Sequence, residues 1–365
     1  MLNATQLEKI VELRHALHAC PERSGCEART MATLRAFLEE NTSLRVEDMG
    51  GWLLATHWEG DGLPTLGFRA DMDAIPVEGT ACDARHGCGH DGHSAVLCGL
   101  GLLLEGRRLG KNVRLIFQCA EETGEGAKRI CETWPGLAEL AALYALHNIP
   151  GFPKGAVLTR RGCFACASCG HVVRVVGRPA HAAYPDDGAN PIELLSGLAL
   201  ETPGMIRDIL AGDDRLLMRT LIGLLAGGEN FGLSASEGQL NQTLRGHRKA
   251  DIDALICDIE TCARAGCEAL GMRCDFELRD VFPDTTNDDA LYDDALARFR
   301  KAGLPTLELD EPMRWSEDFG WYAKRVPAYY FGIGAGEDWP GLHTDAFEFD
   351  DTLIPVALKA LETLL

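Results

Sequence analysis

The chain has 365 residues, of which 46% are hydrophobic and 25% charged, and its formal net charge is −20. This length and composition are typical of a globular protein with one or two domains. The negative charge argues against a nucleic-acid partner, because Lys and Arg are needed to neutralise phosphates. No apolar run approaches the ~20 residues that cross a bilayer, and the N-terminus lacks a secretory pattern, so we expect a cytoplasmic protein that does not enter membranes.

Helical and strand-like patterns alternate along the first half of the sequence. Apolar residues at helical spacing predict helices over residues 4–20, 26–41 and 91–110. Buried strands are predicted over residues 52–58, 63–76, 112–118 and 143–150. This alternation predicts an α/β domain, with a mainly parallel sheet and helices on both faces.

The pattern changes near residue 168. Residues 170–185 and 239–249 alternate like strands, 250–271 read as a helix, and 273–281 read as another strand. Helix–strand alternation then resumes, with a strand predicted over 326–334. We therefore expect a catalytic domain of residues 1–168 and 284–365, interrupted by a smaller α+β domain of residues 169–283.

Potential metal ligands follow several of the predicted strands. Asp71 and Asp73 end one strand, Glu121 and Glu122 follow another, and His147 ends a third. The remaining candidates are Cys88 and His90, which open a helix, and His343, which follows the last strand. Open parallel sheets place their ligand crevice at the carboxyl ends of the strands. Thiolate, imidazole and carboxylate groups suit one or two ions such as Zn²⁺, Mn²⁺, Co²⁺ or Ni²⁺.

The adjacent glutamates indicate hydrolysis. One of them can bind the metal while its neighbour takes a proton from a water that the metal has acidified. A competing hypothesis makes Cys88 a thiol nucleophile with a histidine base. The paired glutamates and the distant histidines have no function in that scheme, so the metal site is the favoured interpretation.

Eight motifs give the sequence a strong resemblance to a known family. They are LHACPE, RADMDAIP, HGCGHDGHSA, QCAEETGEGA, LHNIPGFPKGAV, GRPAHAAYP, WSEDFGWYA and GLHTDAFEFDD, and they occur in this order over nearly the whole chain. In this respect the chain resembles the metal-dependent N-acyl-amino-acid amidohydrolases, which include hippurate and auxin-conjugate hydrolases among the aminoacylase-like metallopeptidases. The resemblance implies hydrolysis of an amide bond in a small N-acyl amino acid.

The resemblance also implies a function for individual residues. The expected ligands of two divalent ions (Mn, Zn, Ni or Co) are Cys88, His90, Glu122, His147 and His343, and the expected general base is Glu121. The inserted domain is expected to act as a lid and to form a homodimer. In related enzymes a lid histidine matching His181 acts from the partner subunit, and Arg245 is the candidate for binding the substrate carboxylate. Asp71 stands where aminoacylase-type relatives have a metal-binding histidine, and Asp73 is expected to orient a ligand.

Two departures from the family pattern leave the substrate open. The segment before residue 86 is short, and Gly232 stands where a substrate-contacting Asn is usual. Alternative reactions are cleavage of a dipeptide or of an aromatic C–N bond. Cys163, Cys166 and Cys169 suggest a third hypothesis, a Cys-rich metal or redox protein, although a complete site needs a fourth ligand. The other histidines, His15, His18, His86, His93 and His171, are expected to be structural or supporting.

Overall fold

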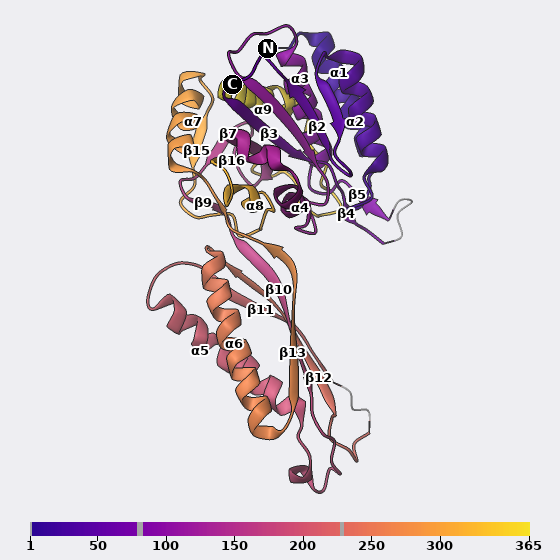
Figure 1. Ribbon diagram of the computed structural model, residues 1–365, viewed down its shortest axis with the longest axis vertical. Helices are drawn as coiled ribbons and strands as arrows, with labels where there is room; N and C mark the ends of the chain where they lie inside the picture. The colour runs from indigo at the N-terminus through magenta and orange to yellow at the C-terminus, as the bar shows by residue number, and fades with distance from the viewer. Residues whose placement is uncertain (1, 79–82, 227–229) are drawn as a thin grey trace. The chain divides into compact units, whose positions relative to one another are not determined.

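The computed structural model describes residues 2–78, 83–226 and 230–365, which form two compact units (Figure 1). The first unit contains Met1–Phe164, Thr285–Pro312 and Asp318–Leu365, and the second contains Ala165–Asp284 and Met313–Glu317. The predicted domain boundaries lie within a few residues of the two main junctions. The activity of the second unit as a lid stays a prediction. Among the described residues, no helix combines the length and the apolar character that a bilayer crossing requires.

An eight-stranded sheet forms the centre of the first unit. Its strands, in spatial order, are β1 (Arg45–Asp48), β2 (Leu53–His57), β6 (Asn112–Gln118), β3 (Thr65–Asp71), β7 (Leu140–Pro150), β16 (Ala328–Gly336), β8 (Val157–Thr159) and β15 (Thr306–Glu308). The four central strands β6, β3, β7 and β16 are parallel, whereas β1, β2 and β8 pair antiparallel with their inner neighbours. The predicted α/β fold with a mainly parallel sheet is confirmed.

Helices cover this sheet. The helices of the first unit are α1 (Ala4–His18), α2 (Ala28–Asn41), α3 (His90–Leu104), α4 (Gly126–Thr133), α7 (Asp289–Lys301), α8 (Gly320–Ala323) and α9 (Ile354–Leu364). α3 packs on β3, β6 and β7, and α7 packs on β8, β15 and β16. Every residue of β3 is buried, and successive side chains of a strand point to opposite faces, so both faces of the sheet are covered at this strand.

α3 carries the start of the cysteine–histidine motif into the core. All fifteen of its residues are buried, which is expected of a helix with apolar residues on every side. Its N-cap is Gly89, whose φ of 101° is a left-handed conformation, and a Cβ at this position would lie 2.2 Å from Asn148 Oδ1. Only glycine fits between Cys88 and His90. The helix ends at Leu104, earlier than the predicted residue 110.

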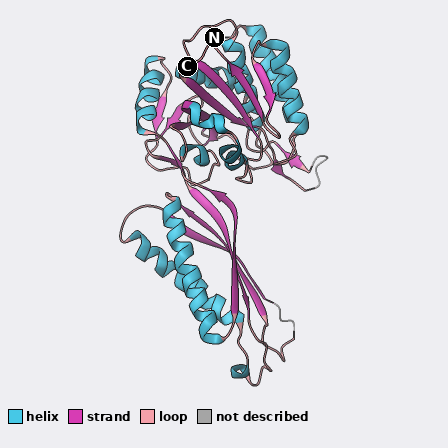
Figure 2. Cartoon of the chain, viewed as in Figure 1, coloured by secondary structure: helices cyan, strands magenta, loops and turns pink. Residues whose placement is uncertain are grey.

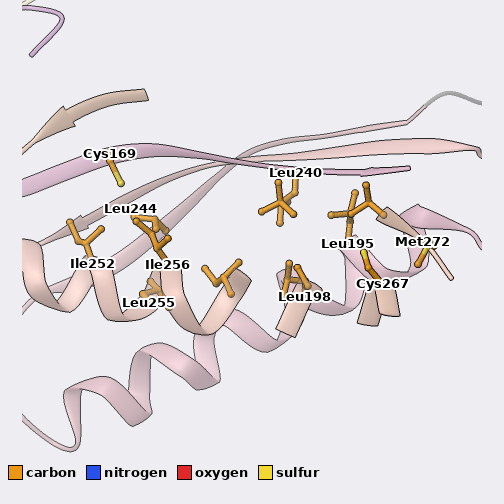
Figure 3. Close-up of a cluster of buried hydrophobic side chains, with 14 of the residues drawn as sticks. Cys169, Leu195, Leu198, Leu240, Leu244, Ile252, Leu255, Ile256, Cys267 and Met272 are labelled. Carbon is orange, nitrogen blue, oxygen red and sulfur yellow. The ribbon is translucent and has the colours of Figure 1, made fainter. Parts of the chain in front are cut away.

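The second unit has an antiparallel sheet with two helices on one face (Figure 2). The strand order is β11 (Leu217–Ala226), β12 (Glu237–Gly246), β10 (Ala167–Val176) and β13 (Arg273–Phe282), and the helices are α5 (Pro191–Leu210) and α6 (Lys249–Leu270). Every second residue of β12 is buried, as the period-2 pattern predicts. Leu244 points from this strand toward Ile252, Leu255 and Ile256 of α6, and Leu240 points toward Leu198 of α5, in a cluster of buried apolar side chains (Figure 3).

The remaining elements are short. Two-stranded ribbons join β4 (Ile75–Pro76) with β5 (Ala84–Arg85) and β9 (Cys163–Ala165) with β14 (Thr285–Thr286). The 3₁₀ helices cover Pro135–Glu139, Pro185–Asp187 and Asp351–Leu353. The strand predicted over 170–185 ends at Val176, so the GRPAHAAYP motif forms a loop instead of a strand.

Candidate metal centre

The potential ligands of the first unit gather beside the carboxyl ends of its parallel strands. β3 ends at Asp71, β6 leads into the loop with Glu121 and Glu122, and His147 lies on β7. Cys88 and His90 stand at the start of α3, which packs on these strands. His343 lies in the loop after β16. The parallel order β6, β3, β7 and β16 therefore brings residues from distant parts of the sequence together.

Two groups of donor atoms share one sulfur. Cys88, His90 and His147 form one group, and Cys88, Glu122 and His343 form the other; within each group the ligand atoms lie within 4.8 Å of one another. Cys88 Sγ is 3.3 Å from His147 Nε2, and His343 Nε2 is 3.6 Å from Glu122 Oε1. The five residues predicted as metal ligands are thus all present, arranged as two overlapping sets around Cys88.

Two buried donor atoms in these groups lack a hydrogen-bond partner. His90 Nε2 and Glu122 Oε1 make no hydrogen bond in the part of the chain that the structure describes. They lie 3.9 Å apart. Buried polar atoms are nearly always hydrogen bonded, so two unsatisfied atoms facing each other indicate a place for a cation. Sulfur, imidazole and carboxylate donors fit Zn²⁺, Mn²⁺, Co²⁺ or Ni²⁺.

The far ring nitrogens of the two buried histidines are held by the protein. His90 Nδ1 lies 3.0 Å from the carbonyl oxygen of Asp73 and 3.2 Å from its Oδ1, and His147 Nδ1 lies 2.7 Å from the carbonyl oxygen of Asn148. An Nδ1–H that donates to these oxygens leaves the lone pair of Nε2 for a metal. Asp73 therefore stands where an orienting residue is expected.

Asp71 is held by Arg69 and by the ring of His93. Its carboxylate accepts a hydrogen bond from Arg69 Nη1 and lies beside His93 Nδ1, each at 2.6 Å. Burial alone would raise the pKa of Asp71, but the charges of His90, Arg69 and His93 hold this pKa well below its usual range. Arg69 also donates to Asp318 at 2.8 Å and to Gln118 at 2.9 Å. A fully buried network thus lies beneath the donor groups.

The two glutamates follow a strained turn. Ala120 has a φ of +52°, which is unusual for a residue with a side chain. Glu121 Oε1 accepts a hydrogen bond from the Asp318 amide at 3.4 Å, and Glu121 Oε2 lies 3.9 Å from His90 Nε2. Glu122 also belongs to the donor group with Cys88 and His343. Glu121 and Glu122 also form a possible donor group with His90, so the assignment of Glu122 as a ligand and Glu121 as the base stays a prediction.

The two remaining predicted site residues belong to the second unit. His181 is exposed, and its Nδ1 accepts a hydrogen bond from Ala183 N at 3.1 Å, so the side chain caps its own turn. Arg245 Nη1 donates to the carbonyl oxygen of Arg314 and to Ser316 Oγ, and Arg245 makes no ion pair with the residues that the structure describes. The Gly232 carbonyl accepts from Ala182 N at 2.9 Å, so Gly232 lies beside the His181 turn.

Two of the other histidines contact neighbouring polar groups, and His93 also forms a possible metal-ligand group with Asp71 and His90, so its supporting function stays a prediction. His93 Nε2 lies 2.6 Å from Asn148 Oδ1, and His18 Nδ1 lies 2.7 Å from Asp91. In the described residues, the potential metal-ligand groups do not include the three cysteines 163, 166 and 169. Part of the short segment before residue 86 (residues 79–82) lies outside the described residues. Asn148 was not predicted to contribute to the site, although it follows His147 within the LHNIPGFPKGAV motif.

Comparisons with known proteins identify the family. The family model of peptidase family M20/M25/M40 matches residues 67–365. N-acetylcysteine deacetylase of Bacillus subtilis is 25% identical over 96% of this chain and 94% of that protein. N-acetyldiaminopimelate deacetylase of Exiguobacterium sibiricum is 26% identical over 98% of both. The structure of a dinuclear metal-binding M20 peptidase of B. subtilis has the same fold, with a TM-score of 0.80 at 23% identity over 99% of this chain and 98% of that one.

These similarities confirm the resemblance seen in the sequence. They also confirm the predicted reaction class, metal-dependent hydrolysis of an amide C–N bond. The chain belongs to peptidase family M20/M25/M40.

Proposed function

We propose that this protein hydrolyses the amide bond of a small N-acyl amino acid, with two divalent ions held by Cys88, His90, Glu122, His147 and His343. The observation that carries the proposal is the pair of donor groups that share Cys88, next to a glutamate that can act as a base. The buried, unsatisfied His90 Nε2 and Glu122 Oε1 support it. The rival hypothesis of a Cys88 nucleophile gives these atoms no function.

Glu121 is the proton-transfer group of the proposed mechanism. Bound divalent ions supply Lewis acidity, which acidifies a water molecule and polarises the amide carbonyl. Glu121 accepts the proton of the attacking water and then delivers it to the leaving nitrogen. The Asp318 amide orients the carboxylate through Oε1, and Oε2, on the side of His90, is the oxygen that carries the proton.

Two residues of the second unit complete the proposal. His181 stabilises the negative charge that develops on the carbonyl oxygen. Arg245 binds the carboxylate of the amino acid, and its guanidinium is suited to this because no acidic residue in the described structure pairs with it. Replacing His181 should lower kcat, whereas replacing Arg245 should raise KM for substrates with a free carboxylate and leave esterified ones unaffected.

The relatives support an N-acetyl or similarly short acyl group. Two of them are named as deacetylases of N-acetylcysteine and N-acetyldiaminopimelate. Gly232 stands where the resemblance leads us to expect an asparagine. Two residues earlier, the side-chain oxygen of Asn230 accepts a hydrogen bond from the Gly232 amide. The substrate therefore meets different polar groups at this loop, so we expect a preference that differs from that of the relatives.

Glu121→Gln tests the mechanism directly. The amide keeps the shape of the side chain but cannot accept the proton, so we expect kcat to fall about 10²–10⁴-fold with the metal content unchanged. Glu125→Gln is the matched control, because Glu125 lies in the same loop with 62% of its side chain exposed and forms a surface pair with Lys128. Full activity of the Glu121 variant would contradict the mechanism.

A substrate panel tests the reaction and its alternatives. Metal-free enzyme is reloaded with Mn²⁺, Zn²⁺, Co²⁺ or Ni²⁺ and assayed on N-acetyl amino acids, N-benzoyl amino acids, dipeptides and aryl amines. Preference for the first two classes supports the proposal, whereas turnover of dipeptides or aryl amines alone would favour an alternative. Plasma mass spectrometry should find two ions per chain, and iron with sulfide would indicate the Cys-rich redox hypothesis instead.

We also propose that the second unit forms a homodimer through β11. This edge strand exposes four apolar side chains, Leu221, Ile222, Leu224 and Leu225, whereas the opposite edge strand β13 exposes Leu278. An exposed apolar edge with free backbone groups is a template for pairing with another strand. A second copy of the chain offers the same edge, so the two can pair around a twofold axis.

Leu225→Asp tests the dimer. A charge on the paired edge should convert the dimer to a monomer in light scattering after size-exclusion chromatography. Leu278→Asp, on the opposite edge of the same sheet, should leave the mass unchanged. A monomeric wild-type protein would contradict the proposal. We further propose a cytoplasmic location, where a reducing environment keeps Cys88 unoxidised and available to bind metal.

A further inference from the structure

A buried carboxylate on a different segment holds the loop that carries both glutamates. Glu27, the residue before α2, is 4% exposed. Its Oε1 accepts a hydrogen bond from the amide of Ala120 at 2.8 Å and another from the amide of Gly25 at 2.9 Å. The sequence gives no sign of the contact with Ala120, because the two partners lie on segments far apart in the chain.

The hydrogen bond falls on the strained residue of the loop. Ala120 has a φ of +52°, a conformation that costs a residue with a Cβ roughly 1–2 kcal/mol. The Ala120 carbonyl is also bonded, since it accepts from Gly126 N at 3.0 Å. Ala120, directly before Glu121, is therefore fixed at both its amide and its carbonyl group, and a strained backbone of this kind persists only where its surroundings hold it.

The segment of residues 24–27 makes a second contact near the metal centre, through Asp73. Ser24 Oγ donates to Asp73 Oδ2 at 2.6 Å, and Glu122 N donates to the same oxygen at 3.0 Å. Asp73 Oδ1 faces His90 Nδ1. Residues 24–27 thus contact the loop with the two glutamates directly through Glu27 and indirectly through Asp73.

We propose that Glu27 is a positioning residue: its carboxylate fixes the left-handed backbone of Ala120 and so aims Glu121 at the reacting water. This inference rests on the proposed function, because it assumes that Glu121 is the base. It assigns a function to a buried acid that belongs to none of the donor groups formed by the described residues. The task requires a hydrogen-bond acceptor at Oε1 and requires no negative charge.

Three variants separate this function from simple stabilisation. Glu27→Ala removes the acceptor, Glu27→Gln keeps a carbonyl oxygen in its place, and Glu22→Ala is the matched control. Glu22 is a second buried acid of the same segment, but its side chain accepts from Arg29 and Thr30 within the first turns of α2. Each variant is assayed with saturating Mn²⁺, and its melting temperature and bound metal are measured.

We expect Glu27→Ala to lower kcat roughly ten- to hundredfold with little change in KM, because misplacing a catalytic group by about 1 Å has effects of this size. Glu27→Gln should restore kcat. Glu22→Ala should lower the melting temperature and leave kcat per folded, metal-loaded molecule unchanged. Hydrogen–deuterium exchange of the peptide covering residues 119–126 should rise in Glu27→Ala and stay at the wild-type level in Glu22→Ala.

The outcomes distinguish this inference from the proposed function. If Glu121→Gln is inactive while Glu27→Ala keeps wild-type kcat, the positioning inference is wrong and the mechanism stands. If Glu22→Ala loses as much kcat as Glu27→Ala, the effect is a general loss of stability and the inference is again wrong. If Glu121→Gln is active, the mechanism itself fails. If Glu27→Ala does not fold, Glu27→Asp replaces it in the test. The Asp side chain is one methylene shorter, so its carboxylate lies farther from the Ala120 amide, and this variant must show the same loss of kcat.

Discussion

Replacing Arg69 by Met tests how strongly the buried network beneath the metal centre stabilises the first unit. The Arg69 side chain is fully buried, and it donates to Asp71 at 2.6 Å, to Asp318 at 2.8 Å and to Gln118 at 2.9 Å. Met fills a similar volume but donates no hydrogen bond. The variant therefore leaves two buried carboxylates without their shared cation.

The size of the effect follows from this burial. Removing one partner of a buried ion pair costs about 3–5 kcal/mol, because the other charge is left uncompensated. For a unit of this size each kcal/mol lowers the melting temperature by about 2–4 °C, so we expect a loss of roughly 6–20 °C. Adding Asp318→Asn to the Arg69→Met variant removes one stranded charge, and the double variant should be less destabilised than the sum of the two single variants.

The assay is thermal unfolding of metal-free protein followed by circular dichroism, since bound metal would add its own stabilisation. Arg174→Met is the matched control. Arg174 pairs with Asp275 and Glu277 on the surface of the second unit, with 32% of its side chain exposed, and pairs of this kind contribute little to stability. An Arg69 variant that melts within 2 °C of wild type (roughly the effect of 1 kcal/mol), or no more than the Arg174 control, would refute the reasoning.

Three further predictions follow from single positions. Burial, and to a smaller extent the charge of Asp73, raise the pKa of Glu27 to about 7. Between about pH 4.5 and 7 the folded state therefore keeps a proton that the unfolded chain has released. Stability should therefore fall between about pH 4.5 and 7, and in urea titrations at pH 8 Glu27→Gln should be up to about 3 kcal/mol more stable than wild type, with no such gain at pH 4. Cys88→Ser should lower the binding of both ions in plasma mass spectrometry, because the two donor groups share this sulfur, and loss of one ion alone would contradict the shared arrangement. Gly92→Ala should destabilise by about 1–3 kcal/mol, because its Cβ would lie 2.2 Å from Phe349, whereas Gly197→Ala meets no atom within 4 Å and should stabilise α5 by about 0.5–1 kcal/mol.

Local patterns in the sequence predict the elements that build the metal centre. β3, β6, β7 and β16 are mostly apolar, and the parallel order brings the polar residues at or just beyond their carboxyl ends to the same edge. The start of α3 inside the cysteine–histidine motif was predicted as well. These features are readable because burial imposes a periodicity on neighbouring residues, and this periodicity depends little on the rest of the fold.

The second unit was harder to predict. α5 contains Pro203 and two glycines, which normally argue against a helix, and packing against β11 and β12 overrides this local preference. β11 has no regular alternation of apolar and polar residues, so its sequence does not show which side is buried. The contact of Glu27 with Ala120 was also not predicted, because a hydrogen bond between distant segments has no period and no motif.

The shared sulfur has a consequence for how the protein holds together. Cys88 lies directly before α3, in the N-terminal part of the sequence, and His343 lies in the loop between β16 and α9. An ion bound to both residues therefore cross-links two segments that are far apart in the sequence of the first unit. Such a cross-link restricts the unfolded chain much as a disulfide does, and its effect grows with the length of the loop that it closes. Bound metal ions would then stabilise the first unit reversibly. A chelator would lower the stability of the strand ends as well as stop catalysis.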